Sequence, residues 1–151
     1  MYSHNIVNML TAQSITALFS NKPCWLKQVT IENGLVLGFG KKFYNRKSEE
    51  YYPEIRILVE ERNWRVIKNG KIILGSDKSY SLENLENALR NISFGNIQSI
   101  ETNTFDVRFV FDEGICLDIM AISSRSNSAF LYIMDKEQTI QYGIRCGFKL
   151  I

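Results

Sequence analysis

Three short apolar or alternating runs lie between residues 55 and 76: Ile55-Arg56-Ile57-Leu58-Val59, Trp64-Arg65-Val66-Ile67 and Ile72-Ile73-Leu74-Gly75. Asn69-Gly70 separates the second run from the third. An Asn-Gly pair between two such runs indicates a β-hairpin, because the tight turn that matches the twist of the strands needs positive φ at both central residues. We therefore expect a β-meander over residues 55–76, and similar hairpin patterns recur along the rest of the chain.

The composition indicates a single globular domain over residues 1–151. A chain of 151 residues can bury a self-sufficient core, and 45% hydrophobic with 23% charged residues are ordinary globular values. The three cysteines form no Cys-x-x-Cys motif and are odd in number, which favours a reducing, cytoplasmic location over a disulfide framework. No apolar run reaches membrane-spanning length, so we expect no membrane partner. The sequence does not indicate the oligomeric state.

Two segments space their apolar residues as helices do. In residues 6–19 this spacing ends before Asn21-Lys22-Pro23, which predicts an N-terminal helix. Ser81 is a good cap for a central helix over residues 82–92, on which Glu86 and Arg90 form a favourable i,i+4 pair. The apolar stripe of this central helix consists of Leu82, Leu85, Leu89 and Ile92.

The other regular segments have the pattern of antiparallel strands. Glu32-Asn33-Gly34 divides residues 25–39 into a hairpin, and Asp112-Glu113-Gly114 divides residues 105–122 into another. Before the second turn the residues alternate, which predicts that Phe105, Val107, Phe109 and Phe111 share one face of a strand. We expect a further hairpin over residues 130–143, a short strand at 97–100, and an extension of the sheet by residues 144–151.

Two stretches interrupt the strand pattern. Gly38-Phe39-Gly40 indicates a bulge or turn at a strand end. Residues 41–53 are charged and aromatic without a clean period, so we expect a loop or ragged edge there. Taken together, the segments predict an α+β fold that is mainly antiparallel sheet, with an N-terminal and a central helix.

The hairpins also suggest an internal repeat of a hairpin-meander unit. Residues 25–76 and residues 105–145 each hold a hairpin, an irregular loop and a second hairpin, and the helix at 82–92 joins them. Two interpretations remain open: a true duplication, or the self-similarity that any meander protein shows.

No residue pattern in the chain is typical of a catalytic site. His4 lies alone near the N-terminus, and no phosphate-binding loop, nucleophile elbow or zinc motif is present. We expect no cofactor and no metal, and Cys116 is expected to be a small buried core residue. An alternative is a metal-dependent enzyme that uses the strand carboxylates Asp106 and Asp118 with nearby glutamates, although acids on strands and in turns are more often structural or solvated.

The stretch from Lys41 to Lys47 interleaves cations with aromatic side chains. Such a stretch suits a small nucleic-acid-binding module, because the rings can stack on bases. The acidic residues that follow and the small net charge of +2 favour protein recognition instead, and Tyr and Arg are enriched at interface hot spots. The predicted partner-binding residues are Lys42, Phe43, Tyr44, Arg46, Lys47, Tyr51 and Tyr52.

A longer pattern resembles small bacterial immunity proteins that are found beside polymorphic and contact-dependent toxins. It consists of Trp64-x-Val66, Asn69-Gly70, Ile73-x-Gly75-Ser76, the leucine-spaced helix, and Asp106-x-Arg108-Phe109-x-Phe111-x-x-Gly114-x-x-Leu117. The resemblance covers about residues 25 to 145, and its motifs are structural rather than catalytic.

This resemblance implies a cytoplasmic, non-enzymatic protein that binds and neutralises one cognate toxin domain. Immunity proteins of nuclease toxins are often acidic, whereas this chain carries a net charge of +2. The class of toxin therefore stays open.

Overall fold

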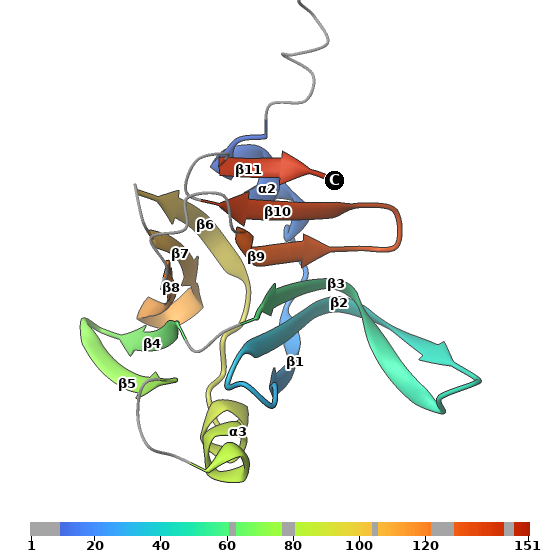
Figure 1. Cartoon of the computed structure of the whole chain (residues 1–151), viewed down its shortest axis with the longest axis horizontal. Helices are drawn as coiled ribbons and strands as arrows, with labels where there is room; N and C mark the ends of the chain where they lie inside the picture. Colours follow the sequence, from blue (N-terminus) through green and yellow to red (C-terminus); the bar gives the residue numbers. More distant parts are fainter. Residues whose placement is uncertain (1–9, 61–62, 77–80, 104–105, 122–128, 144–146) are drawn as a thin grey trace, which may run out of the picture.

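The computed structural model describes residues 10–60, 63–76, 81–103, 106–121, 129–143 and 147–151. Within these ranges, two helices accompany eleven strands that form two antiparallel sheets (Figure 1). The predicted α+β class with mainly antiparallel sheet is therefore confirmed. His4, Phe105, Cys146 and the serine-rich segment at 123–128 lie outside the described residues.

The larger sheet has six strands in the order β1-β2-β3-β9-β10-β11. The hairpins predicted around residues 32–34 and over 130–143 are both present in it. The last strand extends the sheet at its β10 edge, as expected. The strands are β1 (Cys24–Val29), β2 (Leu35–Asn45), β3 (Glu50–Val59), β9 (Ala129–Met134), β10 (Thr139–Gly143) and β11 (Gly147–Leu150).

The smaller sheet has five strands in the order β5-β4-β8-β7-β6. Asn69 and Gly70 have φ of 50° and 82°, which confirms the predicted tight turn between β4 and β5. The alternation along β7 is also confirmed, because Val107, Phe109 and Phe111 are all buried. The strands are β4 (Trp64–Lys68), β5 (Lys71–Gly75), β6 (Ile97–Thr102), β7 (Asp106–Phe111) and β8 (Ile115–Met120).

The meander expected over residues 55–76 is only half correct. β4 and β5 form a hairpin, but β3 pairs with β2 and β9 in the other sheet. The chain therefore crosses from one sheet to the other between Val59 and Trp64. Trp64 fixes this crossing, since its ring is buried and its Nε1 donates to the Asn33 carbonyl at 2.8 Å.

Both helices begin at capped residues. α2 (Ala12–Leu18) begins after Thr11, whose Oγ1 accepts from the Ser14 N–H at 3.0 Å. α3 (Leu82–Arg90) begins after Ser81, as predicted, and the Glu86–Arg90 ion pair forms at 2.9 Å. The described part of the N-terminal helix is shorter than the predicted 6–19 segment, of which residues 6–9 lie outside the described ranges.

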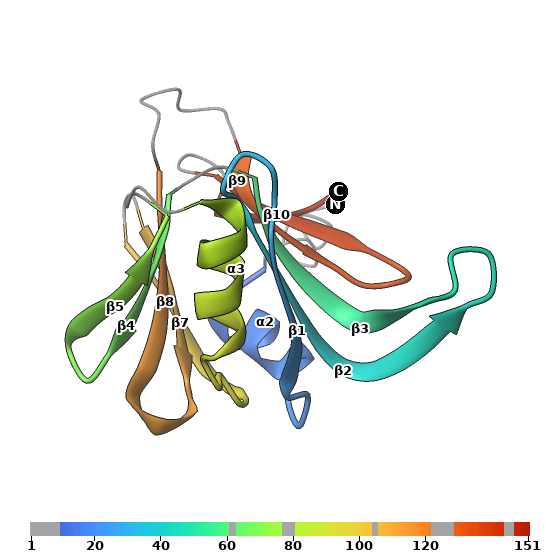
Figure 2. The ribbon, with the colours of Figure 1, turned by 90° about the horizontal axis from the view of Figure 1, so that it is seen from below.

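The helices lie in the wedge between the two sheets (Figure 2). Three rings join the layers there: Phe39 of β2 lies 5.0 Å from Phe19 beside α2 and 6.2 Å from Phe111 of β7, between ring centroids. All three side chains are buried. Burial of apolar surface from both sheets and a helix in one place makes this wedge the core of the molecule.

The arrangement does not display a duplicated unit. Residues 25–76 supply the hairpin β1–β2 to the larger sheet and β4–β5 to the smaller one, whereas residues 105–145 supply their hairpins to the two sheets in the reverse order. The internal repeat stays a prediction.

Residues 41–45 and 50–53 form paired strands joined by a turn, so the predicted loop or ragged edge is wrong. β2 continues to Asn45 and β3 begins at Glu50, and the pairs from Lys42–Pro53 to Asn45–Glu50 extend the hairpin beyond the body of the sheet (Figure 1). A register shift between Phe39 and Lys42, with Gly40 at φ 81°, confirms the bulge predicted from Gly38-Phe39-Gly40. We call residues 41–53 the arm.

Candidate functional site

The arm carries all of the predicted partner-binding residues. Its two strands join through a turn at residues 46–49, in which the Lys47 N–H donates to Asn45 Oδ1 at 2.9 Å. Beyond the bulge, each residue of β2 lies directly opposite a residue of β3. Side chains of neighbouring residues in a strand point to opposite faces, so the aromatic residues of the arm divide into two cross-strand pairs.

Tyr44 and Tyr51 form the exposed pair. They lie opposite each other with ring centroids 5.2 Å apart, and their exposed fractions are 53% and 61%. Among the described residues with large exposed hydrophobic side chains, these two are the only aromatic ones. The pair therefore presents a broad, amphipathic surface to solvent at a fixed spacing.

Phe43 and Tyr52 form the covered pair on the opposite face. Their ring centroids are 5.5 Å apart, and Lys136 Nζ lies 4.0 Å from the Phe43 centroid and 5.7 Å from that of Tyr52. Lys136 belongs to the turn between β9 and β10, so this cation–π contact attaches the arm to the body of the sheet. No local pattern in the sequence points to Lys136, because its place beside the arm depends on pairing between distant strands.

Polar contacts brace the base of the arm. Glu54 Oε1 accepts from the Lys41 N–H at 3.2 Å, and Glu54 Oε2 lies 3.3 Å from Lys22 Nζ. The hydrogen bond from Lys41 and the nearby Lys22 cation lower the pKa of Glu54. On the other side, Lys42 Nζ lies 4.8 Å from the centre of the Trp25 ring. These contacts connect the base of the arm to Lys22, which follows α2, and to Trp25 of β1.

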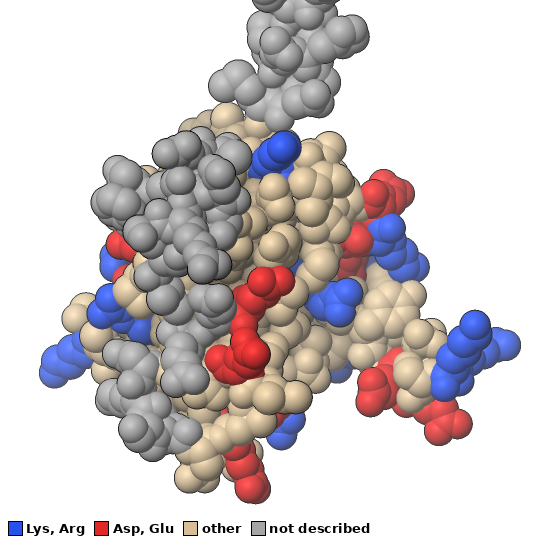
Figure 3. Space-filling view, in the orientation of Figure 1, with Lys and Arg blue, Asp and Glu red and all other residues tan. Residues whose placement is uncertain are grey.

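The arm carries charges of both signs. Arg46 and Lys47 are exposed in the turn, and Glu49 and Glu50 follow them. Figure 3 shows Lys and Arg side chains close to Asp and Glu side chains on the projecting arm. A surface that tracks a nucleic-acid backbone is expected to be more uniformly basic than this one.

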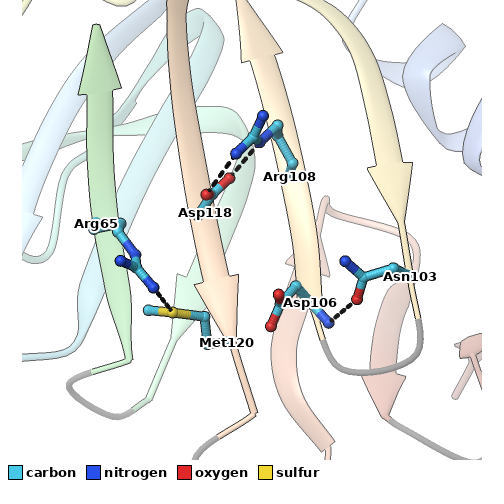
Figure 4. Close-up of polar contacts among 6 residues, drawn as sticks. All are labelled: Arg65, Asn103, Asp106, Arg108, Asp118 and Met120. Carbon is cyan, nitrogen blue, oxygen red and sulfur yellow. Dashed lines mark hydrogen bonds and ion pairs between the residues drawn. The ribbon is translucent and has the colours of Figure 1, made fainter. Parts of the chain in front are cut away.

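The carboxylates of the alternative metal site lie on the smaller sheet, on the face opposite the core (Figure 4). Arg108 Nε and Nη2 donate to the two oxygens of Asp118 at 2.6 and 2.9 Å, and Asp118 raises the pKa of Arg108. Asp106 lies diagonally across the strands, where its N–H donates to Asn103 Oδ1 at 2.8 Å. Among the residues that the structure describes, no group of three or more His, Cys, Asp or Glu side chains could hold a metal ion.

Two cysteines lie within the described ranges. Cys116 was expected to be buried, and that prediction is wrong: it is half-buried, because Ile115, Leu117 and Ile119 occupy the core face of β8. Burial raises the pKa of the Cys24 thiol to about 12. A thiol that stays protonated is a poor nucleophile and a poor metal ligand, so Cys24 has the properties of a structural residue.

Comparison of the chain with protein-family models, curated proteins and solved structures finds no match. In the parts of the chain that the structure describes, neither helix has the length and apolar character that crossing a membrane requires.

Proposed function

We propose that this chain is a protein-binding domain that docks its partner on the arm. The observation that carries the proposal is the exposed Tyr44–Tyr51 pair on a projecting hairpin. Exposed aromatic rings lose little conformational entropy on binding and bury a large area, which is why tyrosine is frequent among interface hot spots.

The bracing of the arm supports the same proposal. Lys136, Trp25 and Glu54 fix the covered face and the base, so the exposed pair is already ordered before a partner arrives. A preorganised surface avoids part of the entropy cost of association. Rigid protein inhibitors combine these two features, an ordered scaffold and a projecting contact surface.

The partner is, in this proposal, the toxin domain of a bacterial polymorphic or contact-dependent toxin system. This step rests on the resemblance of the strand, turn and helix pattern to immunity proteins, not on the arm. The protein would act in the cytoplasm without catalysis, by occupying the surface through which the toxin works. An inhibitor of this kind must bind at roughly nanomolar or lower concentration to protect the cell.

Co-expression tests the proposal directly. The tagged protein is purified from its native cells together with the products of neighbouring genes, and a co-purifying protein is identified by mass spectrometry and titrated by calorimetry. We expect one stoichiometric toxin-like partner and restored growth when both genes are expressed together. A folded, monodisperse preparation that binds none of the neighbouring products, and protects against none of them, would contradict the proposal.

A further inference from the structure

The strands of the arm differ from those in the middle of the six-stranded sheet in how their outer edges are paired. Pairing of β1 with β2 ends at Cys24–Phe39, and pairing of β9 with β3 ends at Met134–Arg56. Beyond these points, Lys42–Asn45 and Glu50–Pro53 pair only with each other within the described part of the chain. Each strand of the arm therefore has an outer edge along which another strand can pair through main-chain hydrogen bonds.

Pro53 distinguishes the two edges. Because proline has no N–H, it is tolerated in a sheet where its nitrogen points away from the neighbouring strand. Pro53 lies opposite Lys42, so the alternation of an antiparallel ladder directs the backbone groups of Lys42 and Tyr44 outward and those of Phe43 toward β3. The β2 edge then offers N–H and C=O groups at both outward positions, whereas the β3 edge lacks a donor at Pro53.

The charges of the arm are divided in the same way. Lys41, Lys42, Arg46 and Lys47 lie on β2 and its end of the turn, and all four are exposed. Glu49, Glu50 and Glu54 lie on β3 and its end of the turn. A strand added beside β2 would thus run next to the cations, with the glutamates on the far side of the arm.

We infer that the β2 edge of the arm, over Lys42–Asn45, accepts an extended acidic segment of the partner as an additional antiparallel strand. This inference rests on the proposed function and names how the partner binds. Opposite charges on neighbouring strands stabilise such a pair, and the Tyr44 ring would lie beside the incoming side chains on its face.

The charges and Pro53 together argue against a second copy of this chain as the occupant. Two β2 edges would bring the same four cations together, and like charges on paired strands are destabilising. Pairing of β2 with the β3 edge of another copy would match the charges but meet Pro53, where the ladder loses a hydrogen bond. An acidic segment from a different protein avoids both problems.

Amide exchange measured by NMR on the whole chain tests the inference. The probe is a short blocked peptide of alternating Glu and Val, and the control peptide alternates Lys and Val. We expect the Glu peptide to slow exchange of the Lys42 and Tyr44 amides at least about tenfold and to change that of Phe43 little. Equal binding of both peptides, absence of binding, or protection without this alternation would overturn the inference, as would concentration-dependent dimerisation through the arm.

Two variants separate the contribution of the Tyr44 backbone N–H to peptide binding from the contribution of its side chain. Tyr44→Ala and Tyr44→Pro both remove the ring, but only Tyr44→Pro removes the outward N–H. We expect the Glu peptide to bind Tyr44→Pro at least about tenfold more weakly than Tyr44→Ala. Equal affinities of the two variants for the Glu peptide would contradict strand addition. If the proline disturbs the Phe43–Lys136 contact, strand addition is judged instead from the exchange pattern of the unaltered chain.

The outcome for strand addition is separate from that for the proposed function. If a toxin-like partner binds on the arm while the Lys42 and Tyr44 amides exchange as fast as before, the proposed docking surface stands but the added strand is refuted. A chain that binds the Glu peptide but none of the neighbouring gene products would refute the proposed function.

Discussion

The Asp112 carboxylate shows how one side chain fixes the end of a hairpin. It accepts a hydrogen bond from the Asn96 N–H at 2.9 Å and another from the Gln98 side-chain amide. These two donors lower the pKa of Asp112 below its ordinary value of 3.8. Gly95 beside it has φ of 73°, and a Cβ there would lie 2.6 Å from Asp112 Oδ2, so glycine is required for this close approach.

The lowered pKa of Asp112 predicts an acid-dependent loss of stability. A group whose pKa is lower in the folded chain stabilises it above the unfolded pKa, and this contribution disappears as the pH falls through the folded pKa. We expect the free energy of unfolding to decrease below about pH 3.8, and Asp112→Asn to remove part of that decrease. Glu54, whose pKa is also lowered, accounts for a further part.

Urea unfolding at a series of pH values measures this effect. Glu113→Gln is the matched control, because Glu113 is the exposed neighbour in the same turn. The control should keep the acid-dependent decrease of the unaltered protein. If Asp112→Asn shows the same decrease as the control, the role assigned to the carboxylate is wrong.

At the scale of secondary structure, Lys27 connects β1 to the end of α3. Its Nζ donates to the backbone carbonyls of Arg90 and Ile92 at 2.7 and 2.6 Å. The last carbonyls of a helix lack partners within the helix and carry partial negative charge, so a cation placed there satisfies and stabilises them. This contact orients α3 in the wedge between the sheets.

Removal of the Lys27 amine should destabilise the domain measurably. We expect Lys27→Met to lower the free energy of unfolding by about 1–2 kcal/mol, because the carbonyls of Arg90, at the end of α3, and of Ile92, just beyond it, lose a charged donor while the aliphatic stem is kept. Chemical denaturation measures this change. The control is Lys149→Met, at an exposed position of β11, which should change the free energy of unfolding by less than about 0.5 kcal/mol. Equal effects of the two substitutions would show that the helix contact contributes nothing specific.

Local signals predicted most of the elements, and non-local pairing explains the failures. Asn69-Gly70, Ser81 and the alternation of β7 each act within a few residues, and the structure confirms all three. Whether β3 pairs with β4 or with β9 depends on contacts between distant segments, which hairpin signals do not encode. The arm was missed because both of its faces lie largely outside the core, so its strands lack an apolar face with a period of two.

The sequence brought the predicted partner-binding residues together but did not indicate how they are arranged. All the predicted partner-binding residues lie on one hairpin, since they are close in the chain. Composition could not separate the exposed Tyr44–Tyr51 pair from the covered Phe43–Tyr52 pair, because that division depends on cross-strand register and on the position of Lys136.

At the scale of the whole molecule, the core and the arm are separate. Phe39 lies where the two sheets and α2 meet, and its side chain is fully buried against Phe19 and Phe111. The arm begins beyond the bulge at Gly40 and extends away from this core. Stability and binding should therefore respond to different substitutions.

Phe39→Ala should be among the most destabilising single substitutions. Loss of the ring leaves a cavity between both sheets and the helix, and we expect the free energy of unfolding to fall by about 3–5 kcal/mol. Thermal or urea unfolding provides the measurement. Ile72→Ala on β5, where the side chain is 51% exposed, should cost much less. A loss for Phe39→Ala no larger than that for Ile72→Ala would show that this contact does not hold the layers together.

Docking on the arm is tested most directly by calorimetric titration of the co-purified toxin-like partner with the double variant Tyr44→Ala/Tyr51→Ala. The control is Ile72→Ala/Ile73→Ala, which removes exposed side chains from β5 of the other sheet. We predict that the tyrosine variant keeps the unfolding midpoint of the unaltered protein but raises the dissociation constant at least about tenfold, while the control leaves it unchanged. An unchanged dissociation constant for the folded tyrosine variant would contradict the assignment of the arm as the docking surface.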